Sequence, residues 1–137
     1  MTGEAKITAG HHLHARHVIH TVGPIWSPTW DNSNSNDSGD KQLAQQQLAS
    51  CYRNCMQLAK KHKLKDIAFP AISTGAYRFP LALATKIAIN EVTRFLIKNN
   101  AQNNDQDNDQ DFPQLVIFVA YDRKVYLEYL NNLQLLQ

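Results

Sequence analysis

The segment of this chain best suited to chemistry is the run Phe69-Pro-Ala-Ile-Ser-Thr-Gly-Ala-Tyr77, which changes from apolar residues to small ones. The small residues at 73–76 let backbone N–H groups approach a ligand closely, and Gly75 can take a positive φ angle that other residues avoid. A helix predicted to begin at Pro80 would bring its unpaired N–H groups and positive dipole end to the same place. The segment therefore indicates an anion site for a phosphate or diphosphate, with the ring of Tyr77 as a flat face for a ribose or base.

A structural interpretation of the same segment stays open at this point. Strand–turn–helix junctions with Ser, Thr and Gly are common, and most of them bind nothing. The loop at 73–77 matches no standard phosphate motif such as the P-loop. Whether the segment is an anion-binding loop or a loop without a ligand depends on features elsewhere in the chain.

Composition limits the classes of protein to consider. At 137 residues, with 43% hydrophobic and 19% charged residues, the chain fits a single globular domain over 1–137. It has no apolar run near the roughly 18 residues that span a bilayer, and residues 1–6 lack the apolar core of a signal peptide. The net charge is +2 and the sequence has no dense stripe of Lys and Arg, so it lacks the basic surface typical of nucleic-acid-binding proteins. We expect a cytoplasmic protein with neither membrane nor nucleic acid as a partner.

Neither the cysteines nor the histidines predict a metal site. Cys51 and Cys55 lie one helical turn apart on an apolar face, where side chains rarely suit a disulfide, so we expect buried thiols. Zinc sites normally show Cys/His spacings with a second pair, and none occurs here. His20 is expected to satisfy hydrogen bonds in the core. We predict no metal and no cofactor for the cluster of His11, His12, His14, His17 and His20.

Three strand-then-helix units would position the loop. The alternation predicts an α/β fold with right-handed crossovers and a mostly parallel sheet. Ligands bind such sheets at the carboxyl ends of the strands, where residues 23–26, 73–77 and 121–122 should converge. The predicted strands are 17–22, 67–69 and 115–121, and the predicted helices are 41–62, 80–98 and one capped by Asp122.

Two polar tracts interrupt this pattern. Residues 27–40 and 101–114, rich in Asn, Asp, Ser and Gln, are predicted as flexible surface inserts, with Asp40 as the N-cap of the next helix. Three strands are few for a sheet whose last strand, 115–121, is apolar on both faces. Strands are therefore missing, and we expect the exposed sheet edge to favour homo-oligomers or domain swapping.

Three stretches closely resemble the macrodomain family, and within it MacroD-type enzymes, which are similar to bacterial O-acetyl-ADP-ribose deacetylases. They are Thr-Gly-Glu-Ala-Lys-Ile-Thr at 2–8, Leu-His-Ala-Arg-His-Val-Ile-His-Thr-Val-Gly-Pro at 13–24 and Phe-Pro-Ala-Ile-Ser-Thr-Gly-Ala-Tyr-Arg-Phe-Pro at 69–80. Residues 116–122 resemble the last core strand of the family. The resemblance implies a three-layer α/β/α sandwich of macrodomain type and ADP-ribose as the ligand.

The resemblance also assigns the ligand site residue by residue. The loop residues 73–77 match the loop that grips the diphosphate and distal ribose, and residues 121–122 match the strand end beside the adenosine. Where the family usually has Gly this chain has Arg78, which either adds a cation beside the diphosphate or points into solvent. The ligand-binding residues implied are Ser73, Thr74, Gly75, Ala76, Tyr77, Tyr121 and Asp122.

The chain departs from the family at the start of the domain. The Gly-Asp-Ile motif, the Asn-Ala-Ala-Asn motif and the Gly-rich loop ending in Val-Asp do not occur in it, and the resemblance begins with Thr-Gly-Glu-Ala at 2–5. In the family these motifs carry the Asp that reads adenine and the catalytic Asn and Asp. We therefore expect a single, N-terminally truncated macrodomain without catalytic residues of its own.

Three functions remain open from the sequence. The first is a hydrolase that removes acyl or protein groups from ADP-ribose, as an O-acetyl-ADP-ribose deacetylase or mono-ADP-ribosylhydrolase. The second is a non-catalytic module that binds ADP-ribose or a related nucleotide, and the third is an inactive truncated remnant. The partners implied are ADP-ribose, O-acetyl-ADP-ribose and ADP-ribosylated protein.

Overall fold

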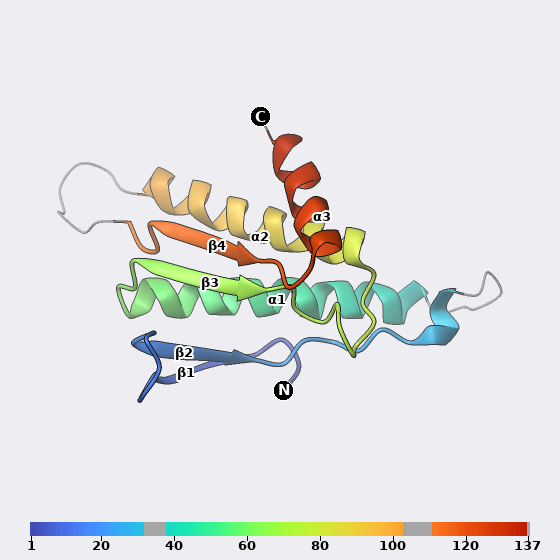
Figure 1. Ribbon diagram of the computed structural model, residues 1–137, viewed down its shortest axis with the longest axis horizontal. Helices are drawn as coiled ribbons and strands as arrows, with labels where there is room; N and C mark the ends of the chain where they lie inside the picture. Colours follow the sequence, from blue (N-terminus) through green and yellow to red (C-terminus); the bar gives the residue numbers. More distant parts are fainter. Residues whose placement is uncertain (32–37, 103–110, 137) are drawn as a thin grey trace.

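The computed structural model describes residues 1–31, 38–102 and 111–136, and Figure 1 shows their arrangement. All of the predicted strands and helices are present, with ends that differ by a few residues. None of the helices in these described ranges is long and apolar enough to cross a membrane. In chain order the elements are β1 (Ala5–Ala9), β2 (His17–Thr21), the 3-10 helix η1 (Pro28–Asp31), α1 (Ser38–Lys61), β3 (Asp66–Pro70), α2 (Leu81–Gln102), β4 (Leu115–Val119) and α3 (Arg123–Gln134).

Strand β1 was not predicted. It pairs antiparallel with β2 in a hairpin whose register places Ile7 opposite Ile19. The hairpin is closed where the N–H of Gly10 donates to the carbonyl oxygen of Arg16 at 2.8 Å. A Cβ on Gly10 would lie 1.8 Å from the carbonyl oxygen of Ala15, so this close backbone approach requires glycine.

Strands β3 and β4 form a second, parallel sheet in which Phe69 lies opposite Phe118. The parallel pairing was predicted, because an α-helical crossover joins the two strands. The prediction of one sheet through all strands is not met in the described residues. They contain two separate two-stranded sheets, β1–β2 and β3–β4, with β2 and β3 unpaired to each other.

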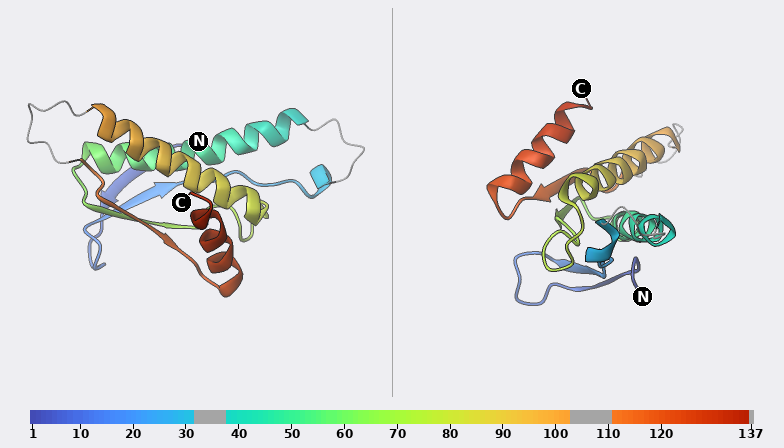
Figure 2. Two further views of the ribbon diagram at one scale, coloured as in Figure 1. Left: turned by 90° about the horizontal axis from the view of Figure 1, so that it is seen from above. Right: turned by 90° about the vertical axis from the view of Figure 1, so that its right-hand side faces the viewer.

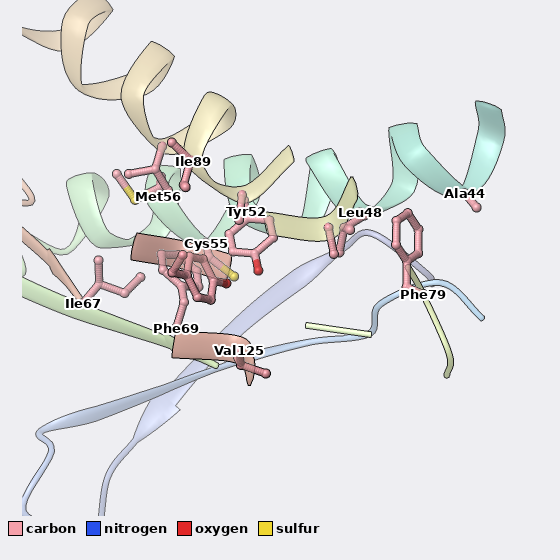
Figure 3. Close-up of a cluster of buried hydrophobic side chains, with 14 of the residues drawn as sticks. Ala44, Leu48, Tyr52, Cys55, Met56, Ile67, Phe69, Phe79, Ile89 and Val125 are labelled. Atoms are coloured by element: carbon pink, nitrogen blue, oxygen red, sulfur yellow. The ribbon is translucent and has the colours of Figure 1, made fainter. Parts of the chain in front are cut away.

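The hydrophobic core is formed by α1, α2 and one face of β3–β4 (Figure 3). Tyr52 of α1, almost fully buried, packs on Phe69 of β3 with the ring centroids 5.0 Å apart. Phe118 of β4 stacks on Tyr129 of α3 at 4.8 Å. Aromatic pairs at this spacing add about 1 kcal/mol each beyond the burial of their apolar area. Other buried residues of α1 are Ala44, Leu48, Cys51, Cys55, Met56 and Ala59.

Helix α3 is fixed at its start and along its length. Asp122 caps it as predicted, because its Oδ1 accepts a hydrogen bond from the N–H of Val125 at 2.9 Å. Further along, Asn132 donates from its Nδ2 to Thr85 Oγ1 of α2 at 3.0 Å, and both side chains are buried. The corresponding prediction for α1 is wrong: the helix begins at Ser38, so Asp40 lies in its first turn.

Regular structure occupies part of both tracts that were predicted as polar inserts. In the tract 27–40, η1 and the first residues of α1 are regular structure, and Trp30 packs edge-on against Trp26 at 5.1 Å. In the tract 101–114, α2 continues to Gln102. Aromatic packing and helix propagation thus order the ends of both tracts. Their central parts, 32–37 and 103–110, lie outside the described residues.

Candidate functional site

The candidate site lies where β2, β3 and β4 end. The three strands point the same way, and their carboxyl ends lie at one side of the molecule (Figure 1). The segments after β2 and β3 are joined directly, because the N–H of Trp26 donates to the carbonyl oxygen of Tyr77 at 2.8 Å. Trp26 is buried and packs against Phe79, with the ring centroids 4.9 Å apart. The predicted convergence of 23–26 with 73–77 is therefore confirmed.

Internal hydrogen bonds fix the path of the loop between β3 and α2. The hydroxyl of Thr74 donates to the carbonyl oxygen of Ala71 at 2.8 Å. At the other end, the N–H of Phe79 donates to the carbonyl oxygen of Ser73 at 2.9 Å, and that of Arg78 donates to Gly75 at 3.0 Å. These bonds close the loop on itself between Ala71 and Phe79.

The backbone strain of the loop lies at its two ends. Ser73 has φ +66° and Arg78 has φ +56°, whereas Gly75 does not adopt a positive φ. The expected role of Gly75 is therefore half wrong: the chain reverses at 73 and 78, and the middle residue needs no left-handed backbone. What Gly75 contributes is its missing side chain, because a Cβ there would meet nothing within 4 Å.

Three consecutive backbone donors are free at the tip of this loop. Gly75, Ala76 and Tyr77 are exposed, and within the described ranges no acceptor pairs with their N–H groups. The space in front of Gly75 is open, so an incoming atom can approach the backbone. Free N–H groups in a loop just before the start of α2, at Leu81, are the type of donor that binds anions.

A contact between Gly23 and Ser73 holds the loop against the end of β2. A Cβ on Gly23 would lie 2.1 Å from Ser73 Oγ and 2.7 Å from Cγ2 of Ile72, so only glycine fits there. The hydroxyl of Ser73 is buried and has no hydrogen-bond partner among the described residues. An unpaired buried hydroxyl is unfavourable by about 1–3 kcal/mol, which makes this atom a candidate for contact with a ligand.

A groove of about 930 Å³ runs between β2 and β3 and reaches this loop. Gly23, Ser73 and Tyr77 line it near the loop, and Cys55 of α1 also lines it. Burial raises the pKa of Cys55 to about 12, so its thiol is neutral at physiological pH. Burial also raises the pKa of Cys51, whose Sγ donates to the carbonyl oxygen of Val22 at 3.4 Å. Both cysteines are buried and free, as predicted.

Tyr121 and Asp122 occupy the end of the neighbouring strand β4. The side chain of Tyr121 is 99% exposed, and the carboxylate of Asp122 is engaged in capping α3. Neither residue lines the groove that Ser73 and Tyr77 line. The structure thus brings the predicted loop residues together with Gly23. Tyr121 and Asp122, which were predicted to lie beside the adenosine, are located at the neighbouring junction between β4 and α3.

Arg78 does not line the groove, whereas His14, His17 and His20 line it on the side of β2. Arg78 is exposed and forms no ion pair with any residue of the described part. His20 is exposed and shares a hydrogen bond of 2.9 Å with Thr8 Oγ1, so its expected place in the core is wrong. It lies on the solvent side of the hairpin because its side chain alternates with that of the half-buried Ile19. Among residues 1–31, 38–102 and 111–136, no three His, Cys, Asp or Glu side chains are grouped to hold a metal.

Comparison with known proteins shows the family of this chain. The family model described as Macro domain matches residues 1–88. A Macro domain-containing protein of Methanosarcina mazei is 44% identical over 122 residues, which is 89% of this chain and 54% of that protein. The ADP-ribose glycohydrolase MACROD2 of Homo sapiens is 37% identical over 96% of this chain and 27% of its own length.

Solved structures show the same fold. The Oceanobacillus iheyensis macrodomain with ADP superposes with a TM-score of 0.77 at 38% identity, over 99% of this chain and 60% of that chain. The 137 residues therefore span only about a quarter to three fifths of the length of these proteins.

Proposed function

The chain belongs to the Macro domain family, and from that premise we propose that these 137 residues bind ADP-ribose at the loop from Ser73 to Tyr77. The observation that carries the proposal is the set of three free backbone N–H groups, at Gly75, Ala76 and Tyr77, in a loop where the position of a Cβ on Gly75 is open. Its support from relatives is the ADP in the Oceanobacillus iheyensis structure and the ADP-ribose in the name of MACROD2.

The chemistry of the loop suits the diphosphate of this ligand. The phosphoryl oxygens accept hydrogen bonds from the three N–H groups, and the N-terminal end of α2 adds a positive dipole beside them. The hydroxyl of Thr74 already donates a hydrogen bond to the carbonyl oxygen of Ala71, so Thr74 contributes by stabilising the loop. Ser73 supplies the buried hydroxyl that has no protein partner in the described ranges.

The two ends of the ligand fit the two sides of the loop. The ring of Tyr77, 39% exposed, offers a face to the distal ribose. At the next junction, Tyr121 offers a fully exposed ring to the adenosine, and Asp122 lies beside it. Stacking on an exposed aromatic ring of this kind contributes about 1–3 kcal/mol per base.

For these 137 residues we propose binding without turnover. Hydrolysis of an ester or glycosidic bond on ADP-ribose needs a positioned acid or base at the ribose. The resemblance assigns that role to an Asn and an Asp in motifs that this sequence does not contain. Removal of acyl or protein groups, the activity of MacroD-type enzymes, would then require polypeptide beyond these residues.

The test of binding is calorimetry with ADP-ribose on the wild-type chain and on Gly75→Val. An added Cβ meets no protein atom within 4 Å, so we expect the fold to be unchanged while the side chain blocks the approach of the phosphate. We expect Kd to rise by at least tenfold. Gly39→Val is the matched control, because a Cβ at Gly39 in the first turn of α1 also meets nothing within 4 Å. Equal binding by wild type and Gly75→Val would remove the loop from the site.

AMP and ADP test the contact with the diphosphate, and O-acetyl-ADP-ribose tests turnover. AMP lacks the second phosphate, so Gly75→Val should weaken AMP binding much less than ADP binding. A release assay with O-acetyl-ADP-ribose tests turnover, and we expect no acetate above the buffer background. Acetate release by the wild-type chain would overturn the proposal of binding without turnover and leave the binding site intact.

A further inference from the structure

A second groove, of about 620 Å³, lies between helices α1 and α2 and is lined mostly by basic side chains. The two helices pack side by side and run in the same direction (Figure 1, Figure 2). Their carboxyl-terminal halves form this helix groove, at the side of the molecule opposite the carboxyl ends of the strands. Among the described residues that line it, Glu91 alone is acidic. The basic residues that line it are Arg53, Lys60, Lys61, Arg94 and Lys98.

Two side chains hold three of these cations in place. The carboxylate of Glu91 lies 3.5 Å from Nε of Arg53 and 3.6 Å from Nη1 of Arg94, and the Glu91 side chain is only 14% exposed. The Nζ of Lys60 donates to Oδ1 of the buried Asn99. Glu91 can neutralise one of its two arginines, and the neutral amide of Asn99 leaves the charge of Lys60 uncompensated.

The other two cations have no partner. Among the residues that the structure describes, the ammonium groups of Lys61 and Lys98 form no ion pair or hydrogen bond. Five cations and one carboxylate line the helix groove, so its net charge is +4, whereas the whole chain carries +2. The positive charge of the molecule is thus concentrated between these two helices.

Helix dipoles account for only part of this charge. Lys60 and Lys61 lie in the last turn of α1, where the negative end of the helix dipole stabilises cations. Helix α2 has no basic residue in its last turn, so this explanation does not apply to Arg94 and Lys98. These two residues are four positions apart on one helix, and like charges at that spacing repel each other. Charges that disfavour folding while the groove is empty are stabilised when an anion enters it.

The spacing of the charges fits an extended acidic peptide. Arg53 and Lys61 are eight positions apart on α1, so the helix groove is about 12 Å long. An extended segment of about four residues, at about 3.3 Å per residue, has this length. Its alternate side chains point the same way and are about 7 Å apart, and Arg94 and Lys98 are about 6 Å apart along α2. Two acidic residues separated by one residue therefore face two cations.

The remaining groups of the helix groove favour a peptide over nucleic acid. Phe95 is half-buried and provides an apolar surface for the aliphatic part of acidic side chains. The exposed amide of Gln57 can donate to and accept from a peptide backbone. A nucleic-acid-binding surface is a longer basic stripe, whereas these cations lie within about 12 Å.

We propose that the helix groove binds an acidic segment of a partner protein, extended along α1 and α2 with its carboxylates paired to Lys61 and Lys98. The proposal is independent of ADP-ribose binding, because no residue lines both the helix groove and the groove that reaches the loop at 73–77. Failure of the ADP-ribose experiment would leave this site untouched, and the converse also holds.

Fluorescence anisotropy with a labelled hexapeptide of alternating Asp and Glu tests the proposal on the full 137-residue chain. We expect saturable binding that weakens as the salt concentration rises, because ions screen exposed charges. The double variant Lys61→Gln with Lys98→Gln should bind the peptide at least tenfold more weakly than wild type. The matched control is Lys41→Gln with Lys86→Gln, which removes the same charge from the same two helices outside the groove. It should stay within threefold of wild type.

Two further measurements separate loss of binding from loss of fold. Lys98 is repelled by Arg94, so Lys98→Gln should unfold at a Tm no lower than that of wild type. The double variant Lys61→Gln with Lys98→Gln should also bind ADP-ribose within twofold of wild type, because the loop at 73–77 lies at the other side of the molecule.

Four outcomes would overturn the proposal. One is the absence of saturable binding of the peptide, and another is an equal loss of affinity in the two double variants, which would reduce the effect to net charge. A third is a single-stranded oligonucleotide with six phosphates that binds as tightly as the peptide and loses affinity in the groove variant, since nucleic acid would then be the partner. The last is peptide binding that requires Asp105→Asn, Asp107→Asn and Asp109→Asn, since the chain's own aspartates would then be the occupant.

Discussion

Two junctions of the same kind lead from a parallel strand into a helix, and they differ in what happens to the N–H groups. Between β4 and α3, the chain turns within residues 120–122, and Asp122 immediately accepts a hydrogen bond from Val125. Between β3 and α2, the chain takes the longer path 71–80, and the N–H groups of 75–77 have no acceptor in the described part. A junction capped by its own carboxylate repels an anion, whereas an uncapped one attracts it.

The open junction is also the more strained of the two. It has positive φ angles at Ser73 and Arg78, a buried hydroxyl without a partner, and a contact with Gly23 that admits no Cβ. Left-handed backbone in residues other than glycine is unfavourable by about 1–2 kcal/mol each. Strain that is held in place by the surrounding structure is a common property of ligand sites, and the junction between β4 and α3 shows none of it. The comparison therefore favours the junction between β3 and α2 as the binding element.

The largest expected effect comes from the contact that holds the open junction. Gly23→Val places a Cβ 2.1 Å from Ser73 Oγ, and overpacking of this kind destabilises by about 3 kcal/mol. Urea denaturation measures the loss, with Gly39→Val as the control in open space. The pair Gly23→Ala with Ser73→Gly should be less destabilised than Gly23→Ala alone, because the nearest clashing atom is removed. Additive losses would show that the two residues do not meet.

The next effect is a dependence of stability on alkaline pH at the groove that underlies the open junction. Cys55 has a pKa of about 12 in the folded chain against 9.0 for an unperturbed thiol, because burial disfavours the thiolate. The stability that this group contributes is therefore complete below pH 9 and is lost as the pH rises toward 12. The free energy of unfolding should fall by about 1 kcal/mol per pH unit in this window.

The variant Cys55→Ala isolates that contribution. Its own destabilisation is the same at every pH, so only the difference in slope against wild type is compared. Denaturation at pH 8, 9, 10 and 11 gives the two curves. Parallel curves would mean that water already reaches the thiol through the groove.

Local patterns predicted most elements of this fold, and long-range pairing accounts for what they missed. The apolar run of β4, the helical stripe around Tyr52 and the cap at Asp122 are each determined within one segment, and all were predicted. Strand β1 was missed because Ala5–Ala9 is short and becomes a strand only by pairing with β2. The separation into two sheets depends on which edges meet, which no single segment encodes.

In the candidate site, too, local features were predicted from the sequence and long-range contacts were not. The small residues at 73–77 predicted a loop with accessible N–H groups, and that loop is present. The contact of Gly23 with Ser73 joins residues that are far apart in the sequence, and the only local signal was a glycine and a proline directly after a strand. The positive φ angles at Ser73 and Arg78 were not predicted. Glycine is the residue that adopts a positive φ most readily, so the sequence suggested Gly75 instead.

A smaller effect is expected at the capped junction. Asp122→Ala removes the acceptor for the N–H of Val125, and loss of an N-cap destabilises by about 1 kcal/mol. Asp122→Asn keeps a capping oxygen and should lie within about 0.5 kcal/mol of wild type. Thermal or urea unfolding monitored by circular dichroism gives both values. Equal losses for the two variants would indicate that charge rather than the hydrogen bond stabilises the start of α3.

The smallest expected effect is at Arg78, where the strain of the open junction can be relieved. Arg78 has φ +56°, so glycine removes a left-handed penalty of about 1–2 kcal/mol. Glycine also gives the unfolded chain more freedom, which offsets about 0.4–1 kcal/mol of the gain. We expect Arg78→Gly to stabilise the chain by about 0.5 kcal/mol, measured by urea denaturation against Arg78→Ala, which keeps the strain. Arg78→Gly and Arg78→Ala also test whether the positive charge of Arg78 contributes to ligand binding. Arg78 is exposed and has no ion pair in the described residues, so both variants should bind ADP-ribose within threefold of wild type. An equal tenfold loss of affinity in both would instead make Arg78 the cation beside the diphosphate, and the strain at this residue would then serve binding.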